Sequence, residues 1–147
     1  MTLRLGAMLS SLRSLRGAPT TADVAPTAAG VPYRAGPRRR GEIPPLADVY
    51  IPRHASGASV VLVHGGAFVI GSRRMKPMRL LAAQLTAAGL AVCAIDYRMI
   101  FRGGGLAEAT ADVRAGFEFW SEHAPAFGLD PRAISLVGLS SGETLSL

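Results

Sequence analysis

The chain has 147 residues, of which 49% are hydrophobic and 18% charged, and its formal net charge is +6. This composition excludes a wholly disordered chain, and the length allows one domain at most. A single cysteine excludes an intrachain disulfide, and no apolar stretch approaches the roughly 20 residues that span a bilayer.

The positive charge is confined to the N-terminal region. Residues 1–40 carry seven arginines against one aspartate, whereas residues 41–147 carry nine basic and nine acidic side chains. The run Arg38–Arg40 has no interleaved aromatic residues and no nucleic-acid motif, so we interpret it as a solvated loop and expect no nucleic-acid partner. A cytoplasmic location is the default expectation, because no secretory signal is recognised.

Two kinds of segment are expected before the folded domain. Residues 1–17 are free of acids and fit either a transit peptide or a short amphipathic helix. Residues 17–45 are rich in Ala, Pro, Gly and Thr, which is typical of an extended linker. We therefore expect residues 1–45 to be a basic segment and linker, with ordered structure beginning near Leu46 and a domain over residues 46–147.

The first elements of this domain are two strands and a helix. Residues 46–51 alternate apolar and smaller or polar side chains, which predicts a half-buried strand that ends at Pro52. Residues 59–63 are continuously apolar and β-branched, as in a central parallel strand. The next apolar residues recur at helical spacing, between Pro77 in a first turn and Gly89 as a cap, at Met78, Leu81, Ala82, Leu85 and Ala88.

The same alternation of strand and helix continues to the C-terminal side. Residues 90–95 predict a second parallel strand, which is followed by Asp96-Tyr97-Arg98. Apolar residues between Leu106 and Trp120 mark one face of an expected amphipathic helix, which should end between residues 123 and 128. Residues 134–137 predict a third buried strand. This pattern favours a parallel α/β sheet, in which ligand chemistry lies beyond the carboxyl ends of the strands. His64, Asp96 and Ser140 all occupy such positions.

The third strand leads into Gly138-Leu139-Ser140-Ser141-Gly142, which matches the nucleophile-elbow pattern Gly-x-Ser-x-Gly. In such an elbow the serine lies on a strained strand-to-helix turn, and glycines two residues away let the backbone pass closely. Ser141 does not fit, because Leu139 and Glu143 are its neighbours at that distance. Ser140 is therefore the candidate nucleophile, and an ordinary tight turn is the alternative.

With these motifs in order, residues 46–147 resemble the hormone-sensitive-lipase-like carboxylesterases of the α/β-hydrolase superfamily. The matching segments lie in the family's order at His64–Phe68 with Gly71-Ser72, Asp96–Arg98, Asp112–Ala115 leading to Trp120, Gly128–Arg132 and the elbow. The resemblance implies a partial α/β-hydrolase fold, with a mostly parallel sheet, flanking helices and a small-molecule ester as substrate. It implies no cofactor and no metal.

The resemblance also implies a role for each site residue. Ser140 would attack an ester carbonyl, and His64 would organise its loop. The backbone N–H groups that would hold the oxyanion are those of Gly65, Gly66, Ala67 and Ser141. Three local departures from the family pattern are Ala67 in place of a glycine, Glu143 after the elbow, and a glycine-rich segment at residues 99–105.

The family takes its general base from a histidine that follows the nucleophile and is preceded by an aspartate or glutamate. No histidine follows Ser140, so we expect this chain to be inactive alone. A non-catalytic remnant or binding module and an amide-cleaving, formamidase-like relative are the alternatives.

Asp96 is expected to pair with nearby backbone or with Arg98. The last strand is expected to expose an edge through which chains self-associate, without stable membrane insertion.

Overall fold

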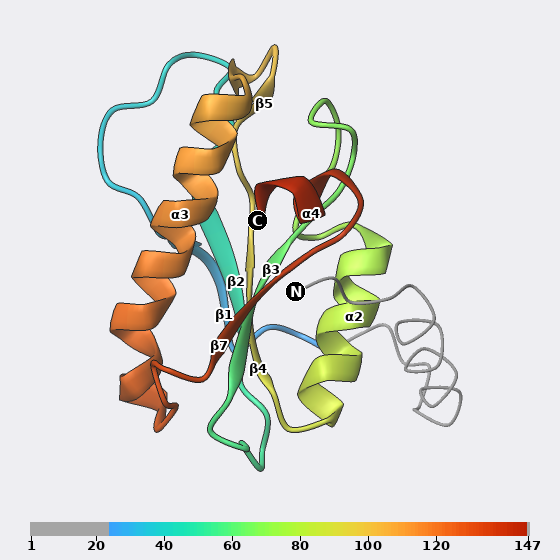
Figure 1. The fold of residues 1–147 in the computed structure, drawn as a ribbon, viewed down its shortest axis with the longest axis vertical. Coiled ribbons are helices and arrows are strands. Elements are labelled where there is room, and N and C mark those ends of the chain that lie inside the picture. Colours follow the sequence, from blue (N-terminus) through green and yellow to red (C-terminus); the bar gives the residue numbers. More distant parts are fainter. Residues whose placement is uncertain (1–23, 147) are drawn as a thin grey trace.

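A twisted five-stranded sheet, seen edge-on between two helices in Figure 1, forms the centre of the computed structural model, which describes residues 24–146. The strand order is β1-β2-β4-β3-β7. The strands are β1 (Ala28–Pro32), β2 (Leu46–Tyr50), β3 (Ser59–Val63), β4 (Ala91–Ile95) and β7 (Ile134–Gly138).

The three parallel strands β4, β3 and β7 lie where the sequence predicts them, but β7 is only partly buried, with Ser135 exposed, and is not the buried strand that was expected. β3 pairs in parallel with β4 on one side and with β7 on the other, so that Val61 lies opposite both Cys93 and Leu136. All residues of β3 and β4 are buried, which is why both segments are apolar apart from Ser59 at the start of β3. Burial also raises the pKa of the Cys93 thiol to about 12, as expected for an inert core cysteine.

The structure corrects the expectation that order begins near Leu46. β1 lies inside the segment predicted as linker and pairs antiparallel with β2, which in turn pairs antiparallel with β4. The short Ala-Ala-Gly-Val-Pro sequence has neither alternation nor a β-branched run, so no local pattern indicates this strand. Tertiary contacts hold it, because the Gly30 N–H donates to the buried Asp48 carboxylate at 2.8 Å.

One helix covers each face of the sheet (Figure 1). α2 (Lys76–Ala87) begins with a proline in its first turn and is followed by Gly89 at φ 87°, as the sequence predicts. α3 (Leu106–His123) packs on the other face, and Glu108 accepts a hydrogen bond from the Gly105 N–H at 2.8 Å. The two apolar cores on either side of the sheet are therefore those that the helical spacing indicates.

Shorter elements complete the described chain. β5 (Met99–Ile100) and β6 (Gly103–Gly104) pair in parallel across a tight turn that is closed by an antiparallel bridge between Met99 and Arg102, and we call this turn, residues 99–104, the hairpin. η2 (Ala124–Phe127) is a 3-10 helix after α3, and α4 (Ser141–Leu145) follows β7. Within residues 24–146, β7 pairs with β3 only and so forms an edge of the sheet. Self-association through this edge stays a prediction. None of the helices in the same residues has the length and apolar character needed to cross a bilayer.

A buried hydrogen bond fixes α3 against β3. The indole Nε1–H of Trp120, which is 1% exposed, donates to the hydroxyl of Ser59 at 2.9 Å. Ser59 starts β3, so this contact sets the height of the helix along the strand that leads to the site.

We predict that Ser59→Ala lowers the free energy of unfolding by about 1–3 kcal/mol, because the Trp120 N–H is then buried without a partner. Urea denaturation at neutral pH measures this change. Ser135→Ala on β7 is the matched control, since Ser135 is exposed, and it should change stability by less than about 0.5 kcal/mol. Equal effects of the two variants would contradict a structural role for the indole bond.

Candidate active site

Ser140 has the backbone of a strained strand-to-helix turn. It lies between β7 and α4 with φ 53° and ψ −118°, a region that side-chain-bearing residues rarely adopt. Hydrogen bonds of 2.9 Å from the Gly142 N–H to the Leu139 carbonyl, and from the Glu143 N–H to the Ser140 carbonyl, close the turn. The turn leaves Ser140 exposed to solvent. An ordinary turn does not need such strain, whereas a nucleophile elbow has it.

The glycines on either side of Ser140 are required by close backbone contacts. A Cβ on Gly138 would lie 2.1 Å from the carbonyl carbon of Gly142. A Cβ on Gly142 would lie 2.6 Å from the carbonyl oxygen of Val63, at the end of β3. The Gly-x-Ser-x-Gly spacing therefore lets the elbow close and lets α4 pack against the neighbouring strand.

The loop after β3 packs directly against this elbow. A Cβ on Gly65 would lie 3.0 Å from the Ser140 Cβ and 2.5 Å from the Leu139 carbonyl oxygen. Gly66 has φ 128°, and its carbonyl accepts hydrogen bonds from the Val69 and Ile70 N–H groups at 3.1 and 3.0 Å. The structure thus brings Gly65 and Ser140 together, as the sequence predicts for strands β3 and β7.

The same loop turns some of its N–H groups away from the protein's own acceptors. Ala67 and Phe68 both have positive φ, 52° and 62°, so the backbone winds in the left-handed sense. Within residues 24–146, the N–H groups of Gly66 and Ala67 donate no hydrogen bond. Such unpaired donors beside a nucleophile can bind an oxyanion, because they need no rearrangement when charge develops.

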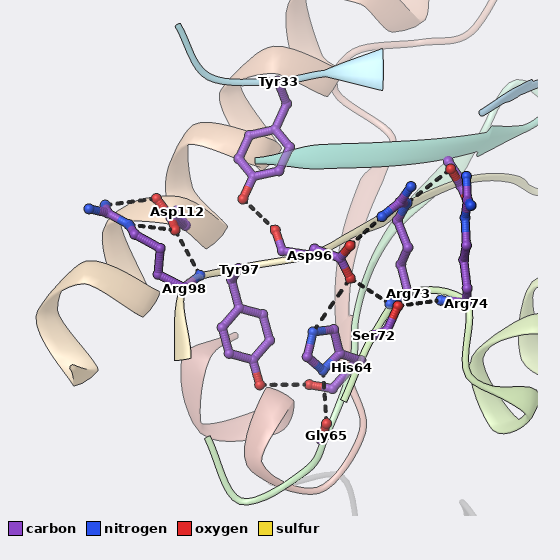
Figure 2. A network of polar contacts seen from close by, with 11 residues as sticks. Tyr33, His64, Gly65, Ser72, Arg73, Arg74, Asp96, Tyr97, Arg98 and Asp112 are labelled. Atoms are coloured by element: carbon purple, nitrogen blue, oxygen red, sulfur yellow. Dashed lines mark hydrogen bonds and ion pairs between the residues drawn. The ribbon is translucent and has the colours of Figure 1, made fainter. Parts of the chain in front are cut away.

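His64 lies beneath the loop after β3. Its ring is fully buried, stacks on Tyr97 at 4.4 Å between centroids, and donates from Nδ1 to the Gly65 carbonyl at 2.8 Å (Figure 2). Tyr97 donates its hydroxyl to the His64 carbonyl at 3.0 Å. Burial lowers the pKa of His64, so the imidazole is neutral, and its proton is assigned to Nδ1 by the carbonyl partner.

Asp96, at the end of β4, contacts both ends of the loop after β3. Its carboxylate accepts a hydrogen bond from the Arg73 N–H at 2.7 Å and a second one from the Arg73 guanidinium (Figure 2). His64 Nε2 lies 3.8 Å from the same carboxylate. The Arg73 guanidinium also lies 2.9 Å from the buried Asp48 of β2. One nearly buried arginine therefore joins two buried carboxylates below the loop.

The pairing of Asp96 confirms one expectation and corrects the other. The expected backbone partner is found in the Arg73 N–H, but Arg98 does not contact Asp96. Arg98 instead binds Asp112 of α3 through its own N–H, Nε and Nη2 at 2.9 Å each. Figure 2 shows the Asp96 carboxylate directed toward Arg73 and the Arg98 guanidinium directed toward Asp112 of α3.

The residues that follow Ser140 differ in the burial of their side chains. The Ser141 hydroxyl is buried near Tyr97, whose pKa is raised by burial and partly lowered by this hydroxyl. The Ser141 N–H begins α4, directly after the nucleophile. Glu143 is exposed in the first turn of the short helix.

The two remaining histidines are surface residues, as the sequence indicates. His54 is exposed in the connection after β2, and the exposed His123 bonds the Phe119 carbonyl at the end of α3 at 2.7 Å. Among residues 24–146, no group of three or more His, Cys, Asp or Glu side chains is arranged to hold a metal ion. The site described here therefore consists of a serine, a set of N–H donors and a buried polar support.

Residues of this support were missed by sequence reasoning. Asp48 has a weak signal, since it is an acidic residue within an otherwise apolar strand. Arg73 has none, because Gly-Ser-Arg-Arg gives no indication that its first arginine is buried while Arg74 is exposed. Tyr33, which donates its hydroxyl to the Asp96 carbonyl, lies in the segment predicted as linker.

Comparisons with known proteins agree with this geometry. Residues 47–147 match the BD-FAE family. A probable isoprenylcysteine alpha-carbonyl methylesterase of Arabidopsis thaliana is 37% identical over 101 residues, which is 67% of this chain and 23% of the relative. Gut esterase 1 of Caenorhabditis elegans is 31% identical over 105 residues, which is 65% of this chain and 18% of the relative. The chain thus spans less than a quarter of these relatives.

A solved structure shows the same fold. The propionate-bound esterase of the planctomycete Thermogutta terrifontis superposes with a TM-score of 0.64 at 25% sequence identity. The match covers 71% of this chain and 39% of that protein. The fold is accordingly a partial α/β-hydrolase fold, with the mostly parallel sheet and flanking helices that the sequence predicts.

We predict that Arg73→Met lowers the free energy of unfolding by about 3–5 kcal/mol, because it leaves the Asp96 carboxylate buried without its cation and leaves Asp48 with only the largely exposed Arg74. Arg74→Met is the matched control, since the Arg74 side chain is 58% exposed and its bond to Asp48 is 3.1 Å long. It should cost less than about 1 kcal/mol. Urea denaturation of both variants makes the comparison, and a small effect of Arg73→Met would refute the buried clamp.

The neutral state of His64 predicts a pH-dependent stability. Its folded pKa is lowered, mainly by burial, whereas the unfolded chain binds this proton with a pKa of about 6.5. The unfolded state therefore binds more protons as the pH falls below about 6.5, and the free energy of unfolding decreases. Urea denaturation between about pH 7.5 and 5 should show this decrease.

His64→Asn should flatten that profile, because an amide can replace the Nδ1–H donor without titrating. His123→Asn is the control, since the exposed His123 should leave the profile unchanged. A profile that keeps its slope in His64→Asn would assign the effect to other groups.

Proposed function

The chain belongs to the BD-FAE family of hormone-sensitive-lipase-like α/β-hydrolases, and we propose on that premise that it carries the nucleophile of a carboxylic-ester hydrolase, Ser140. The observation that carries this proposal is the strained backbone of Ser140, which is held against Gly65 in the loop after β3. Such strain in a side-chain-bearing residue is retained where the surrounding structure enforces it, commonly at active sites.

The chemistry follows from the position of the donors. The Ser140 oxygen attacks the ester carbonyl carbon, the carbonyl π electrons move to the carbonyl oxygen, and the hydroxyl proton passes to a general base. The N–H groups of Gly66, Ala67 and Ser141, together with Gly65, stabilise the resulting oxyanion. Collapse of the intermediate expels the alkoxide, which takes up the proton, and leaves an acyl group on Ser140. Water then releases the acid.

Ala67 and Glu143, which depart from the family pattern, have different effects on binding of the oxyanion. The substitution at Ala67 is compatible with the role, because the backbone N–H is unchanged and the residue already adopts positive φ. The exposed Glu143 carboxylate lies in the first turn of α4, where a negative charge suits the helix terminus. At low ionic strength it also opposes negative charge at the adjacent oxyanion site.

His64 is proposed as a positioning residue for the oxyanion loop. Its Nδ1–H is already bound to the Gly65 carbonyl, and its ring is enclosed between Tyr97 and the Asp96 carboxylate. A general base needs an unprotonated nitrogen within reach of the serine hydroxyl. His64 Nε2 faces Asp96 instead, which supports a structural role.

We expect no efficient turnover from these residues alone. The three histidines of the sequence are the buried His64, which faces Asp96, the exposed His54 in the connection after β2, and the exposed His123 at the end of α3. Without a base, a serine retains only the residual contributions of the oxyanion hole and binding. The proposed substrate is a small-molecule carboxylic ester, in keeping with relatives named as esterases and methylesterases.

A chemical-rescue assay tests this proposal on the chain as it exists. With p-nitrophenyl acetate, the chain alone should hydrolyse little more than Ser140→Ala. Added imidazole can act as an external base, so it should raise the rate of the parent above that of Ser140→Ala by about tenfold or more. Mass spectrometry after treatment with a fluorophosphonate and imidazole should locate the adduct on Ser140.

Ser135→Ala is the control, because Ser135 is an exposed serine of β7, and this variant should react as the parent does. A folded parent whose rescue equals that of Ser140→Ala, with no adduct on Ser140, would exclude this serine as the nucleophile. Full turnover without imidazole, lost in Ser140→Ala, would support the nucleophile but overturn the expected inactivity.

A further inference from the structure

Apolar side chains project from the loops around the candidate site. Val69 is 44% exposed, Ile70 70%, Phe101 92% and Leu106 58%, and we call these four residues the apolar rim. They come from the loop after β3, the turn of the β5–β6 hairpin and the first residue of α3. Exposure of this degree at four large apolar residues is unusual, since such clusters generally mark interaction surfaces.

Backbone contacts hold the parts of the rim together. The Ile100 N–H donates to the Phe68 carbonyl at 2.8 Å, so the hairpin that carries Phe101 is bound to the loop that carries Val69 and Ile70. The hairpin also contacts the start of α3. Phe101 has φ 65°, a strained conformation for an aromatic residue, and its side chain extends into solvent from the hairpin turn.

A cationic surface lies next to the apolar rim. We call Arg38, Arg39, Arg40 and Arg102 the basic border; all four are exposed, and the structure gives their side chains no ion pair within residues 24–146. The Arg102 carbonyl accepts a hydrogen bond from the Ile43 N–H at 3.3 Å, which joins the hairpin to the connection that carries the other three arginines. In Figure 1 this connection, the hairpin and the start of α3 lie at the same end of the molecule.

The acidic groups at this end are directed inward. Glu42 binds Arg34 at 3.0 Å and the Arg39 N–H at 2.8 Å, and Asp112 is held by Arg34 and Arg98. Glu108 bonds the Gly105 N–H. The inner arginines are thereby neutralised. Within residues 24–146 no acidic side chain forms an ion pair with the basic border, although the charge of Arg39 contributes to the lowered pKa of Glu108.

We propose that the apolar rim and the basic border dock the protein on an anionic lipid surface. Apolar side chains that insert at the boundary of headgroups and acyl chains, flanked by arginines that meet anionic headgroups, are the two elements of reversible membrane binding. The rim consists of separate projecting side chains, which suits a fluid lipid layer better than the broad, close-packed area of a stable protein interface. Docking in this orientation places Ser140 near molecules held in the lipid surface.

Vesicle co-sedimentation of the full chain tests the apolar part. The chain should bind phosphatidylcholine vesicles that contain phosphatidylglycerol, and Ile70→Asn/Phe101→Asn should weaken this partitioning at least about tenfold. Asparagine is well tolerated at positive φ, so the Phe101 substitution relieves backbone strain and should not unfold the chain. Phe127→Asn is the matched control, because Phe127 is also exposed but lies in η2, beyond the other end of α3.

Charge is tested with the same vesicles. Arg102→Glu should weaken binding at least about fivefold, and pure phosphatidylcholine vesicles should bind more weakly than the mixed ones. Arg53→Glu is the control, since Arg53 is exposed in the connection between β2 and β3.

Absence of vesicle binding by the parent would overturn the proposal. So would equal binding by the parent and Ile70→Asn/Phe101→Asn, which would assign the membrane contact to another segment such as residues 1–23. If the rim substitutions change the oligomeric state in size-exclusion chromatography but not vesicle binding, the rim is a protein interface instead. Each of these outcomes is independent of whether Ser140 is catalytic.

Discussion

The buried Asp96 carboxylate organises the site, because it contacts both ends of the loop after β3. His64 at the start of the loop lies 3.8 Å from it, and Arg73 at the end of the loop binds it through backbone and side chain. Asp48 shares Arg73 and also binds the Gly30 N–H of β1. Burial raises the pKa of Asp48, but hydrogen bonds from Gly30 and the two arginines outweigh it and hold the carboxylate ionised. Two anions and one buried cation thus connect the strands to the oxyanion loop.

The second constraint is the close contact between two backbone turns. β3 and β7 are neighbours in a parallel sheet, so the loops that follow them emerge side by side. Gly65, Gly138 and Gly142 allow distances that a Cβ would prevent, and Ser140 accepts a strained conformation in the space that they leave. Within residues 24–146 the fold itself positions the unpaired N–H groups of Gly66 and Ala67, which are proposed to hold the oxyanion. Activation of the serine is a separate requirement, which needs a base that these strands do not provide.

Features that depend on local spacing were predictable from the sequence. Continuous β-branched runs indicate strands that are buried on both faces, and apolar residues at helical spacing indicate α2 and α3. For α2 the sequence also indicates both ends, through Pro77 and Gly89. The positions of Ser140 and the glycine-rich loop follow from motifs whose glycines have a steric reason. The family and its parallel sheet could therefore be inferred, although β1, with no recognisable pattern, could not.

The sequence by itself determined the pattern of parallel strands and helices and the position of the Gly-x-Ser-x-Gly turn, and it supplied Ser140 as the candidate nucleophile. Only the tertiary structure decided which charges meet. Asp96 pairs with Arg73 rather than with Arg98, two residues further along the chain, because α3 brings Asp112 to Arg98 and the end of the loop after β3 brings Arg73 to Asp96. Likewise, nothing local shows that Arg73 is buried, or that the hairpin at Phe101 and the loop at Ile70 form one rim. Such pairings depend on how distant segments pack, whereas a motif depends only on the geometry of its own backbone.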